Sequence, residues 1–451
     1  MQTENKEFIK DVFTLALPMG LQQVINLCVT LIDSIMIGSL GEAAITAVSV
    51  CSTFGWLSYT FTNGLANGAL VFAAQDYGNK NLARIKKLLS LVVTLALVSG
   101  IFFFILTTLF PVQIIKIYSN VPEIIQPGCE YLKYIKYTYP IQAISFSIVL
   151  LLRSVRSVKV GFYNSLFSCF SNVFFNWVFI YGNLGAPALG AAGAAIGTLI
   201  ARIIELIVTL IYLFFIEQNL KFKPSDYSLD LPWSYILQYF QVMIPLLIID
   251  VLSSLVSSAQ TMISGRISAY YVAANSIVHM SWQIPSVFAF GVGMSASIKI
   301  GNSLGENNFK KASEDAQRYL ITSIILGLFC GLTVQIICPI LSTFYNVTEE
   351  TLILARQMSY AASVVIIFTM INLCVCNGCI KAGGMSKQLL RIDLFSNWFI
   401  AIPLGALCAF VFHMPCYILY FVLRIGNVIK VIWGIYRLKK GDWMRNLSQT
   451  V

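Results

Sequence analysis

The chain has 451 residues, of which 57% are hydrophobic and only 11% are charged. Soluble globular proteins carry about twice that charged fraction, so the composition excludes an ordinary soluble domain and predicts a protein embedded in a bilayer. The formal net charge of +10 does not indicate nucleic-acid binding, because the basic residues gather in the connections between apolar stretches.

A membrane-spanning helix needs roughly 20 mostly apolar residues, and the chain contains twelve such stretches in succession. They lie at 12–38, 46–74, 88–110, 127–152, 161–182, 188–216, 234–264, 270–298, 317–341, 351–380, 389–412 and 414–436. The sequence therefore predicts an all-α polytopic membrane protein with 12 transmembrane helices in two pseudo-symmetric six-helix lobes.

The longest plainly polar connection, with two prolines and two aspartates, divides the spans into two sets of six. We expect an N-terminal six-helix lobe at 1–216, a cytoplasmic linker at 217–233, a C-terminal six-helix lobe at 234–440 and a cytoplasmic tail at 441–451.

The two predicted lobes share an internal repeat with a constant shift of 227 residues. Identical pairs at this shift are Gly38 and Gly265, Ala47 and Ala274, Gly64 and Gly291, Gly78 and Gly305, and Asn81 and Asn308. Six crossings per copy give both copies the same direction, so we expect a symmetry axis along the membrane normal. We also expect Gly78 and Gly305 to cap their helices. At the same shift Asp33 falls on Gln260, so only the first copy has a charge there.

Basic residues are distributed unevenly between the two sides of the membrane. If the N-terminus is cytoplasmic, 22 of the 30 lysines and arginines fall on the cytoplasmic side. This asymmetry is the positive-inside pattern, and it predicts a multi-pass protein with both termini in the cytoplasm.

Asp33 lies deep in the first predicted span, with no basic residue within one helical turn. An ionised carboxylate at the bilayer centre costs about 2.5–3.5 kcal/mol on insertion scales, so such a group faces a water-filled cavity, binds a cation or takes up a proton. The alternative is that Asp33 only hydrogen-bonds neighbouring helices. We favour a functional role, because intramembrane acids usually serve transport.

The fifth span adds Asn172 and Asn176, which are four residues apart and therefore share one helix face. With Thr198 of the sixth span and Asp33, they offer oxygen ligands to a hard cation such as Na⁺. The two asparagines are equally compatible with a role in helix packing.

Other polar residues in the spans are secondary candidates. Asp250 lies one turn into the seventh span and is a second possible ion-binding acid, Gln260 can bind substrate or a neighbouring helix, and His279 can titrate near neutral pH. Arg202 and Glu205 are three residues apart, so we expect an ion pair within the sixth span.

No catalytic motif is present. The chain has neither the phosphate loop GxxxxGK[ST] nor HExxH, and it contains only two histidines. The sequence therefore predicts no catalytic residue, no enzymatic activity, no ATP binding and no cofactor beyond a coupling ion. The eleven cysteines lie mainly within spans and are interpreted as small buried apolar residues.

Five segments together resemble the multidrug and toxic compound extrusion (MATE) transporters. They are LPMGLQQVINLCVTLIDSIMIGSLG (17–41), NGLANGALVFAAQDYG (63–78), NWVFIYGNLGAPALGAAGAAIGTLIAR (176–202), GVGMSASIKIGNSLGENN (291–308) and KVIWGIYRLKKGDW (430–443). The resemblance is closer to the DinF-like than to the NorM-like branch, and it covers essentially the whole chain in order.

The resemblance implies a bacterial secondary antiporter of the inner or plasma membrane. Its two lobes would rock to export amphiphilic or cationic compounds in exchange for H⁺ or Na⁺, with Asp33 as the coupling-ion residue. In the DinF-like branch the position of Asn176 holds a second aspartate, so its absence here favours a proton or a weaker sodium site. The expected partners are small molecules and lipid, without nucleic acid or ATP, and the protein is expected to be a monomer. The alternative is a lipid-linked precursor flippase of the wider superfamily.

Overall fold

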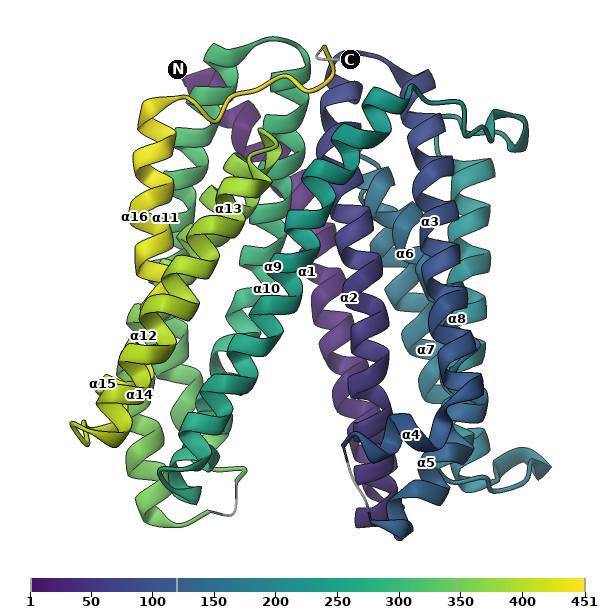
Figure 1. The fold of residues 1–451 in the computed structure, drawn as a ribbon, viewed down its shortest axis with the longest axis vertical. Coiled ribbons are helices and arrows are strands. Elements are labelled where there is room, and N and C mark those ends of the chain that lie inside the picture. Colours follow the sequence, from purple (N-terminus) through teal and green to yellow (C-terminus); the bar gives the residue numbers. More distant parts are fainter. Residues whose placement is uncertain (1, 119–120, 346, 450–451) are drawn as a thin grey trace. The chain divides into compact units, whose positions relative to one another are not determined.

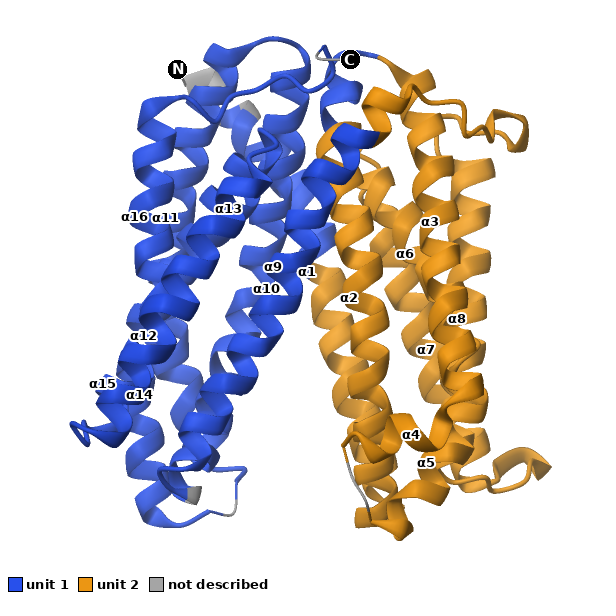
Figure 2. Cartoon of the chain, viewed as in Figure 1, with its two compact units in different colours: residues 1–20, 74–80, 237–451 blue, residues 21–73, 81–236 orange. Residues whose placement is uncertain are grey.

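The computed structural model describes residues 2–118, 121–345 and 347–449. Within these ranges the chain is almost entirely helical and has no β-strand (Figure 1). The helices form two compact units (Figure 2). Unit 2 comprises residues 21–73 and 81–236, and unit 1 comprises residues 1–20, 74–80 and 237–451.

Unit 2 is built around the packing of α7 on α8 and of α3 on α6, and α8 also contacts α5 and α6. Its helices, including parts of α1 and α2, are α1 (Gln2–Gly38), α2 (Glu42–Gly78), α3 (Leu82–Leu109), α4 (Pro111–Lys116), α5 (Pro122–Ile135), α6 (Thr138–Ser154), α7 (Lys159–Tyr181) and α8 (Ala191–Ile211). Short 3₁₀ turns lie at Asn183–Gly185 and Pro224–Asp226, and a π-helical turn, Tyr212–Ile216, extends α8.

In unit 1, α10, α11 and α12 pack against one another, α15 and α16 pack on α12, and α13 and α14 pack on η5. Its elements are α9 (Trp233–Gly265), α10 (Ala269–Gly305), α11 (Phe309–Ser342), α12 (Glu349–Cys374), η4 (Val375–Ile380), α13 (Ser386–Asp393), η5 (Leu394–Ala401), α14 (Ile402–Phe410), α15 (Cys416–Val422) and α16 (Gly426–Lys440). The segments η4 and η5 are π-helical.

Each predicted span falls on a helix or on a run of consecutive helices. Among the described residues, nine helices are long and apolar enough to cross a membrane, and the bent pair α5–α6 makes a tenth. The two others are α2 and α7, whose several serine, threonine and asparagine residues lower their hydropathy. The predicted span 127–152 differs from expectation, because it is two helices bent by 49°. Pro140 lies in the first turn of α6, where the missing N–H costs nothing.

The internal repeat is visible in the backbone of the connectors that follow α2 and α10. Lys80 and Asn307 both have φ of 57°, and they are related by the shift of 227 residues. Each connector then ends in a side-chain cap, in which Asn81 accepts from the amide of Arg84 and Asn308 does the same one repeat later. The same local sequence thus builds the same helix stop and restart in both copies.

Gly78 and Gly305 end their helices, as predicted, but neither has a positive φ. A Cβ at Gly78 would lie 1.9 Å from the carbonyl oxygen of Asn302, and one at Gly305 would lie 1.9 Å from that of Gln75. These two backbones cross in direct contact, and Asn302 donates to the carbonyl of Ala74 at 2.8 Å. Glycine is required here for close helix approach rather than for a left-handed cap.

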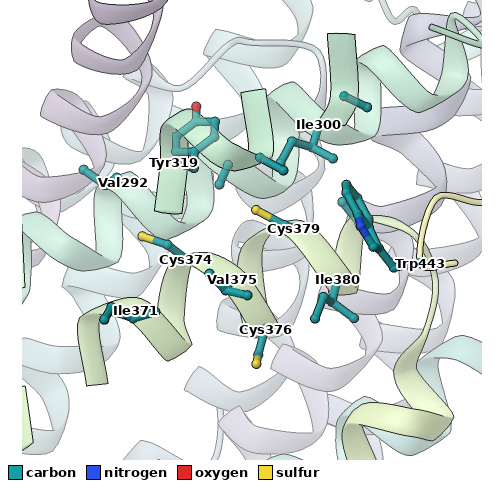
Figure 3. Close-up of a cluster of buried hydrophobic side chains, with 14 of the residues drawn as sticks. Val292, Ile300, Tyr319, Ile371, Cys374, Val375, Cys376, Cys379, Ile380 and Trp443 are labelled. Carbon is teal, nitrogen blue, oxygen red and sulfur yellow. The ribbon is translucent and has the colours of Figure 1, made fainter. Parts of the chain in front are cut away.

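The core of unit 1 includes the cysteines that cluster at the end of α12. Cys374, Cys376 and Cys379 are buried together with Tyr319 and Trp443 (Figure 3). Among the described residues, no group of three or more His, Cys, Asp or Glu side chains is placed to hold a metal ion. The cysteines therefore act as core packing residues in this unit.

Candidate functional site

Asp33 and the asparagines of the fifth span meet inside unit 2. The amide nitrogen of Asn176 donates to Asp33 Oδ1 at 2.7 Å and lies 3.2 Å from Asn172 Oδ1. The amide of Asn172 in turn donates to Thr198 Oγ1 at 3.3 Å. All four residues predicted from sequence thus form one hydrogen-bonded line, which we call the Asp33 cluster, across α1, α7 and α8.

The Asp33 cluster is largely buried. Asn172 and Asn176 are only 3% and 1% exposed, while Asp33 and Thr198 are partly buried. A carboxylate in such a place depends on its hydrogen-bond donor for stability, because burial without a partner is costly. Protonation of Asp33, or arrival of a cation, would therefore change the whole line of bonds.

The orientation of Asn176 bears on which ion fits. Its nitrogen faces both Asp33 and Asn172, whereas its oxygen Oδ1 is buried and has no hydrogen-bond partner among the described residues. In this arrangement Asp33, Asn172 and Thr198 offer oxygens, but Asn176 offers a donor that a cation does not bind. In this conformation the amide group of Asn176 does not add an oxygen ligand to those of Asp33, Asn172 and Thr198.

Gly197 of α8 is a residue of the site that was not among the residues predicted from the sequence. A Cβ at this position would lie 2.1 Å from Asn176 Oδ1, so only glycine leaves room for the amide. Gly193 has a similar role, because its Cβ would lie 2.2 Å from the carbonyl oxygen of Phe179. The segment 190–197 is rich in glycine, but only the tertiary structure shows that Gly197 makes room for the amide of Asn176.

The ion pair expected within α8 is present. Arg202 Nη1 lies 2.5 Å from Glu205 Oε2, and Ser145 donates to the other oxygen of Glu205 at 3.2 Å. Arg202 is also near enough to Asp33 to attract it electrostatically. The carboxylate of Asp33 is therefore not paired directly with Arg202, whose salt bridge is made with Glu205.

The secondary candidates, all in unit 1, do not line one common cavity. Gln260 lines a cavity and donates to the carbonyl oxygen of Leu423 at 2.6 Å. Asp250 is partly buried and interacts electrostatically with Lys381. His279 is exposed and stands edge-on to Trp282, with ring centroids 5.3 Å apart. Neither Asp250 nor His279 lines the cavity that contains Gln260.

A family model for MatE matches residues 18–178 and 245–407. The two matches begin at Pro18 and Pro245, which are related by the shift of 227 residues, and together they cover more than half of the chain. The chain belongs to the MatE family. As a MATE protein it is a multidrug efflux transporter and not an enzyme, as the sequence predicted.

Proteins named for multidrug resistance match this chain over most of their length. The probable multidrug resistance protein YoeA of Bacillus subtilis is 23% identical over 391 residues, covering 86% of this chain and 84% of YoeA. The multidrug resistance protein NorM of Photobacterium profundum is 22% identical over 416 residues, covering 88% and 86%. Because NorM proteins are among these relatives, the predicted closeness to the DinF-like branch stays a prediction.

Solved structures give the same fold. The Vibrio cholerae MATE transporter VcmN in its bent form superposes with a TM-score of 0.87 at 17% identity, covering 97% of this chain and 98% of VcmN. This likeness confirms the predicted fold class, an all-α membrane protein with twelve transmembrane helices in two lobes. The protein is thus a multi-pass membrane transporter, and the match to MATE proteins does not favour the flippase alternative.

Proposed function

We propose that the protein is a secondary active antiporter that exports amphiphilic or cationic compounds in exchange for an ion bound at Asp33. The observation that carries the proposal is the Asp33 cluster, a carboxylate held by amides inside membrane-spanning helices. Membership of the MATE family and the drug-resistance names of the relatives support the class of exported compound.

The coupling ion that the cluster supports best is a proton. An ionised carboxylate within a bilayer costs about 2.5–3.5 kcal/mol on insertion scales, and here one amide donor offsets part of that cost. Loading a proton removes the charge and with it the need for the Asn176 bond. The charge state of Asp33 therefore changes its hydrogen bond to α7, and through Asn172 the contact with α8. Coupling requires such a link between ion binding and helix contacts.

The free energy of one proton is sufficient for useful export. One positive charge moving inward across 100 mV releases about 2.3 kcal/mol, and one pH unit adds about 1.4 kcal/mol. Together they sustain a concentration ratio of several hundred for a neutral substrate at about one proton per cycle. No ATP is needed for this stoichiometry.

The rest of the proposal follows the family resemblance. The two lobes rock between inward- and outward-facing states, the protein works as a monomer in the bacterial inner or plasma membrane, and both termini are cytoplasmic. The uneven distribution of basic residues supports this orientation.

Asp33→Asn is expected to leave folding intact and to reduce proton-driven efflux at least about tenfold, because an amide cannot carry the titrating proton. The measurement is ethidium efflux from proteoliposomes under an imposed pH gradient, with Asp230→Asn as the control, since Asp230 is exposed and lies in the 217–233 connection. Efflux by Asp33→Asn at the wild-type rate would contradict the proposal.

The same proteoliposomes distinguish the two ions. With pH equal on both sides, a sodium gradient is expected to drive little efflux, because the Asn176 amide presents its nitrogen to the carboxylate. Strong sodium-driven efflux that disappears in choline buffer would show that Na⁺ is the coupling ion instead, with Asn172 and Thr198 as its further ligands.

A further inference from the structure

Unit 1 contains a polar cavity of about 230 Å³ between α9, α10, α12, η5 and the last two helices. Its wall includes the aromatic side chains of Trp282 and Tyr420 and the amides of Asn397 and Asn427. Among the described residues, two cationic side chains line it and no acidic side chain does. This is the opposite polarity to the Asp33 cluster of unit 2.

One of the two cations is already neutralised. Lys430 Nζ lies 2.8 Å from Asp393 Oδ1, and both side chains are largely buried. Asn397 also donates to the same carboxylate oxygen at 3.1 Å. Lys430 and Asp393 therefore form a closed pair at the cavity wall, and this pair contributes no net charge.

The other cation, Arg424, has no acidic partner among the residues that the structure describes. Its Nη1 donates to the carbonyl of Tyr420 at 3.4 Å and its Nη2 to Asn275 Oδ1 at 3.3 Å. The guanidinium carbon lies 3.8 Å from the centre of the Tyr420 ring. A guanidinium has five N–H donors, so two hydrogen bonds and the cation–π contact with Tyr420 leave the charge without an ionic partner, and several donors without an acceptor, among the described residues.

The internal repeat relates this cavity to the ion site of the other lobe by position in the sequence. Gln260, which lines the cavity, is the counterpart of Asp33 at the shift of 227 residues. The first copy has an acid at this position, and the second copy has a neutral amide in the cavity wall that also contains Arg424, which has no acidic partner among the described residues. An unpaired charge within a membrane span is costly and marks a functional site by default.

We propose that this cavity binds the carboxylate of a small amphiphilic aromatic molecule. Arg424 offers a planar pair of N–H groups that matches a carboxylate, and Trp282 and Tyr420 provide apolar surface for the rest of the molecule. A single net positive charge fits a monoanion, whereas a doubly charged phosphate would leave excess negative charge inside the span. The inference deepens the proposed function, since it assigns zwitterionic or carboxylate-bearing amphiphiles to the exported compounds.

The test is direct binding to purified protein in detergent, without any gradient. 4-Bromobenzoate is titrated while tryptophan fluorescence is recorded, and 4-bromobenzamide serves as the neutral analogue. We expect saturable quenching by the carboxylate, at least about tenfold tighter than by the amide, and loss of most of the signal in Trp282→Phe. Absence of saturable quenching, or equal affinity for the two compounds, would overturn the inference.

Arg424→Gln is expected to abolish the preference for the carboxylate, whereas Arg266→Gln, outside the cavity, leaves it unchanged. If Arg424→Gln does not fold, Gln260→Asp provides the second variant. It places an acid at the repeat-equivalent position, where it pairs with Arg424 and excludes the ligand. Wild-type affinity in a folded form of either variant would refute the assignment.

Two further measurements test the charge of the ligand and the independence of the cavity from the Asp33 cluster. 4-Bromophenyl phosphate is expected to bind more weakly than the carboxylate, and tighter binding of the phosphate would overturn the choice of a monoanion. Asp33→Asn protein is expected to bind 4-bromobenzoate like the wild type, because the two sites lie in different units. If 4-bromobenzoate does not bind but efflux still depends on Asp33, the cavity proposal is wrong and the proposed antiport function still holds.

Discussion

In the Asp33 cluster, the orientation of the Asn176 side chain decides which of its atoms faces the carboxylate. The sequence indicates the four polar residues and their helices, but not that the nitrogen of Asn176 faces the carboxylate. That orientation depends on Gly197, since any larger residue would collide with the amide oxygen. A residue without a side chain is thus as specific to the site as the residues that carry its chemistry.

Gly197→Ala is expected to displace Asn176, because the new Cβ would lie 2.1 Å from its Oδ1. Overpacking of this kind costs about 1–3 kcal/mol, and loss of the bond to Asp33 should reduce gradient-driven efflux several-fold. Efflux and the thermal unfolding midpoint are measured together, with Gly38→Ala as the control, since no atom of the described residues lies within 4 Å of a Cβ there. Wild-type efflux in Gly197→Ala would show that the amide orientation does not matter.

Lys381 provides a pH-dependent effect on stability outside the membrane-spanning helices. It lies between η4 and α13 and is 7% exposed. Burial lowers the pKa of Lys381 from 10.5 to about 8, although the charge of Asp250 acts to raise that pKa. Between about pH 8 and 10.5 the unfolded chain therefore binds more protons than the folded one, so stability rises with pH in this window.

The expected result is that the wild type gains stability relative to Lys381→Met as the pH is raised from 7 to 10. The gain is at most about 3 kcal/mol, from 1.36 kcal/mol per pKa unit. Thermal unfolding of both proteins in detergent across this range measures it, because the other titrating groups are common to both. If the difference in stability between wild type and Lys381→Met does not change with pH, the pKa of Lys381 is not lowered by burial in the folded protein.

At the scale of elements, two of the predicted spans are not regular α-helices throughout but contain π-helical segments. The spans predicted at 351–380 and 389–412 contain the π-helical segments η4 and η5. Insertions of this kind often accompany functional sites, and η5 presents Asn397 to the cavity of unit 1. Hydrophobic periodicity cannot reveal them, because one extra residue in a turn does not change the apolar composition of a span.

The crossing of α2 and α10 is the second element-scale feature. Gly78→Val and Gly305→Val are each expected to destabilise the protein strongly, since a Cβ would lie 1.9 Å from a backbone oxygen that has no room to move. Thermal unfolding and expression in membranes measure the effect. Gly265→Val is the control, because none of the atoms that the structure describes lies within 4 Å of a Cβ at that helix end. Normal stability of both glycine variants would show that the crossing can open without cost.

At the scale of the whole molecule, the compact units do not follow the order of the chain. Residues 1–20 and 74–80 belong with residues 237–451 in unit 1. The contacts within unit 1 explain this grouping, since Asp11 lies 3.1 Å from Lys299 Nζ and the ring of Phe8 packs on that of Tyr319 at 5.0 Å. The predicted tail 441–451 is also part of this unit, where Trp443 is fully buried.

The sequence by itself determined the membrane fold, the repeat and the residues of the Asp33 cluster. It did so because apolar length, constant spacing and a charge in an apolar span are local signals. Only the tertiary structure decided which way Asn176 points, what Gly78 and Gly197 make room for, and that Arg424 stays without an acidic partner among the described residues. Those facts depend on which backbones approach each other and which charges are already paired, and such contacts join residues far apart in the chain.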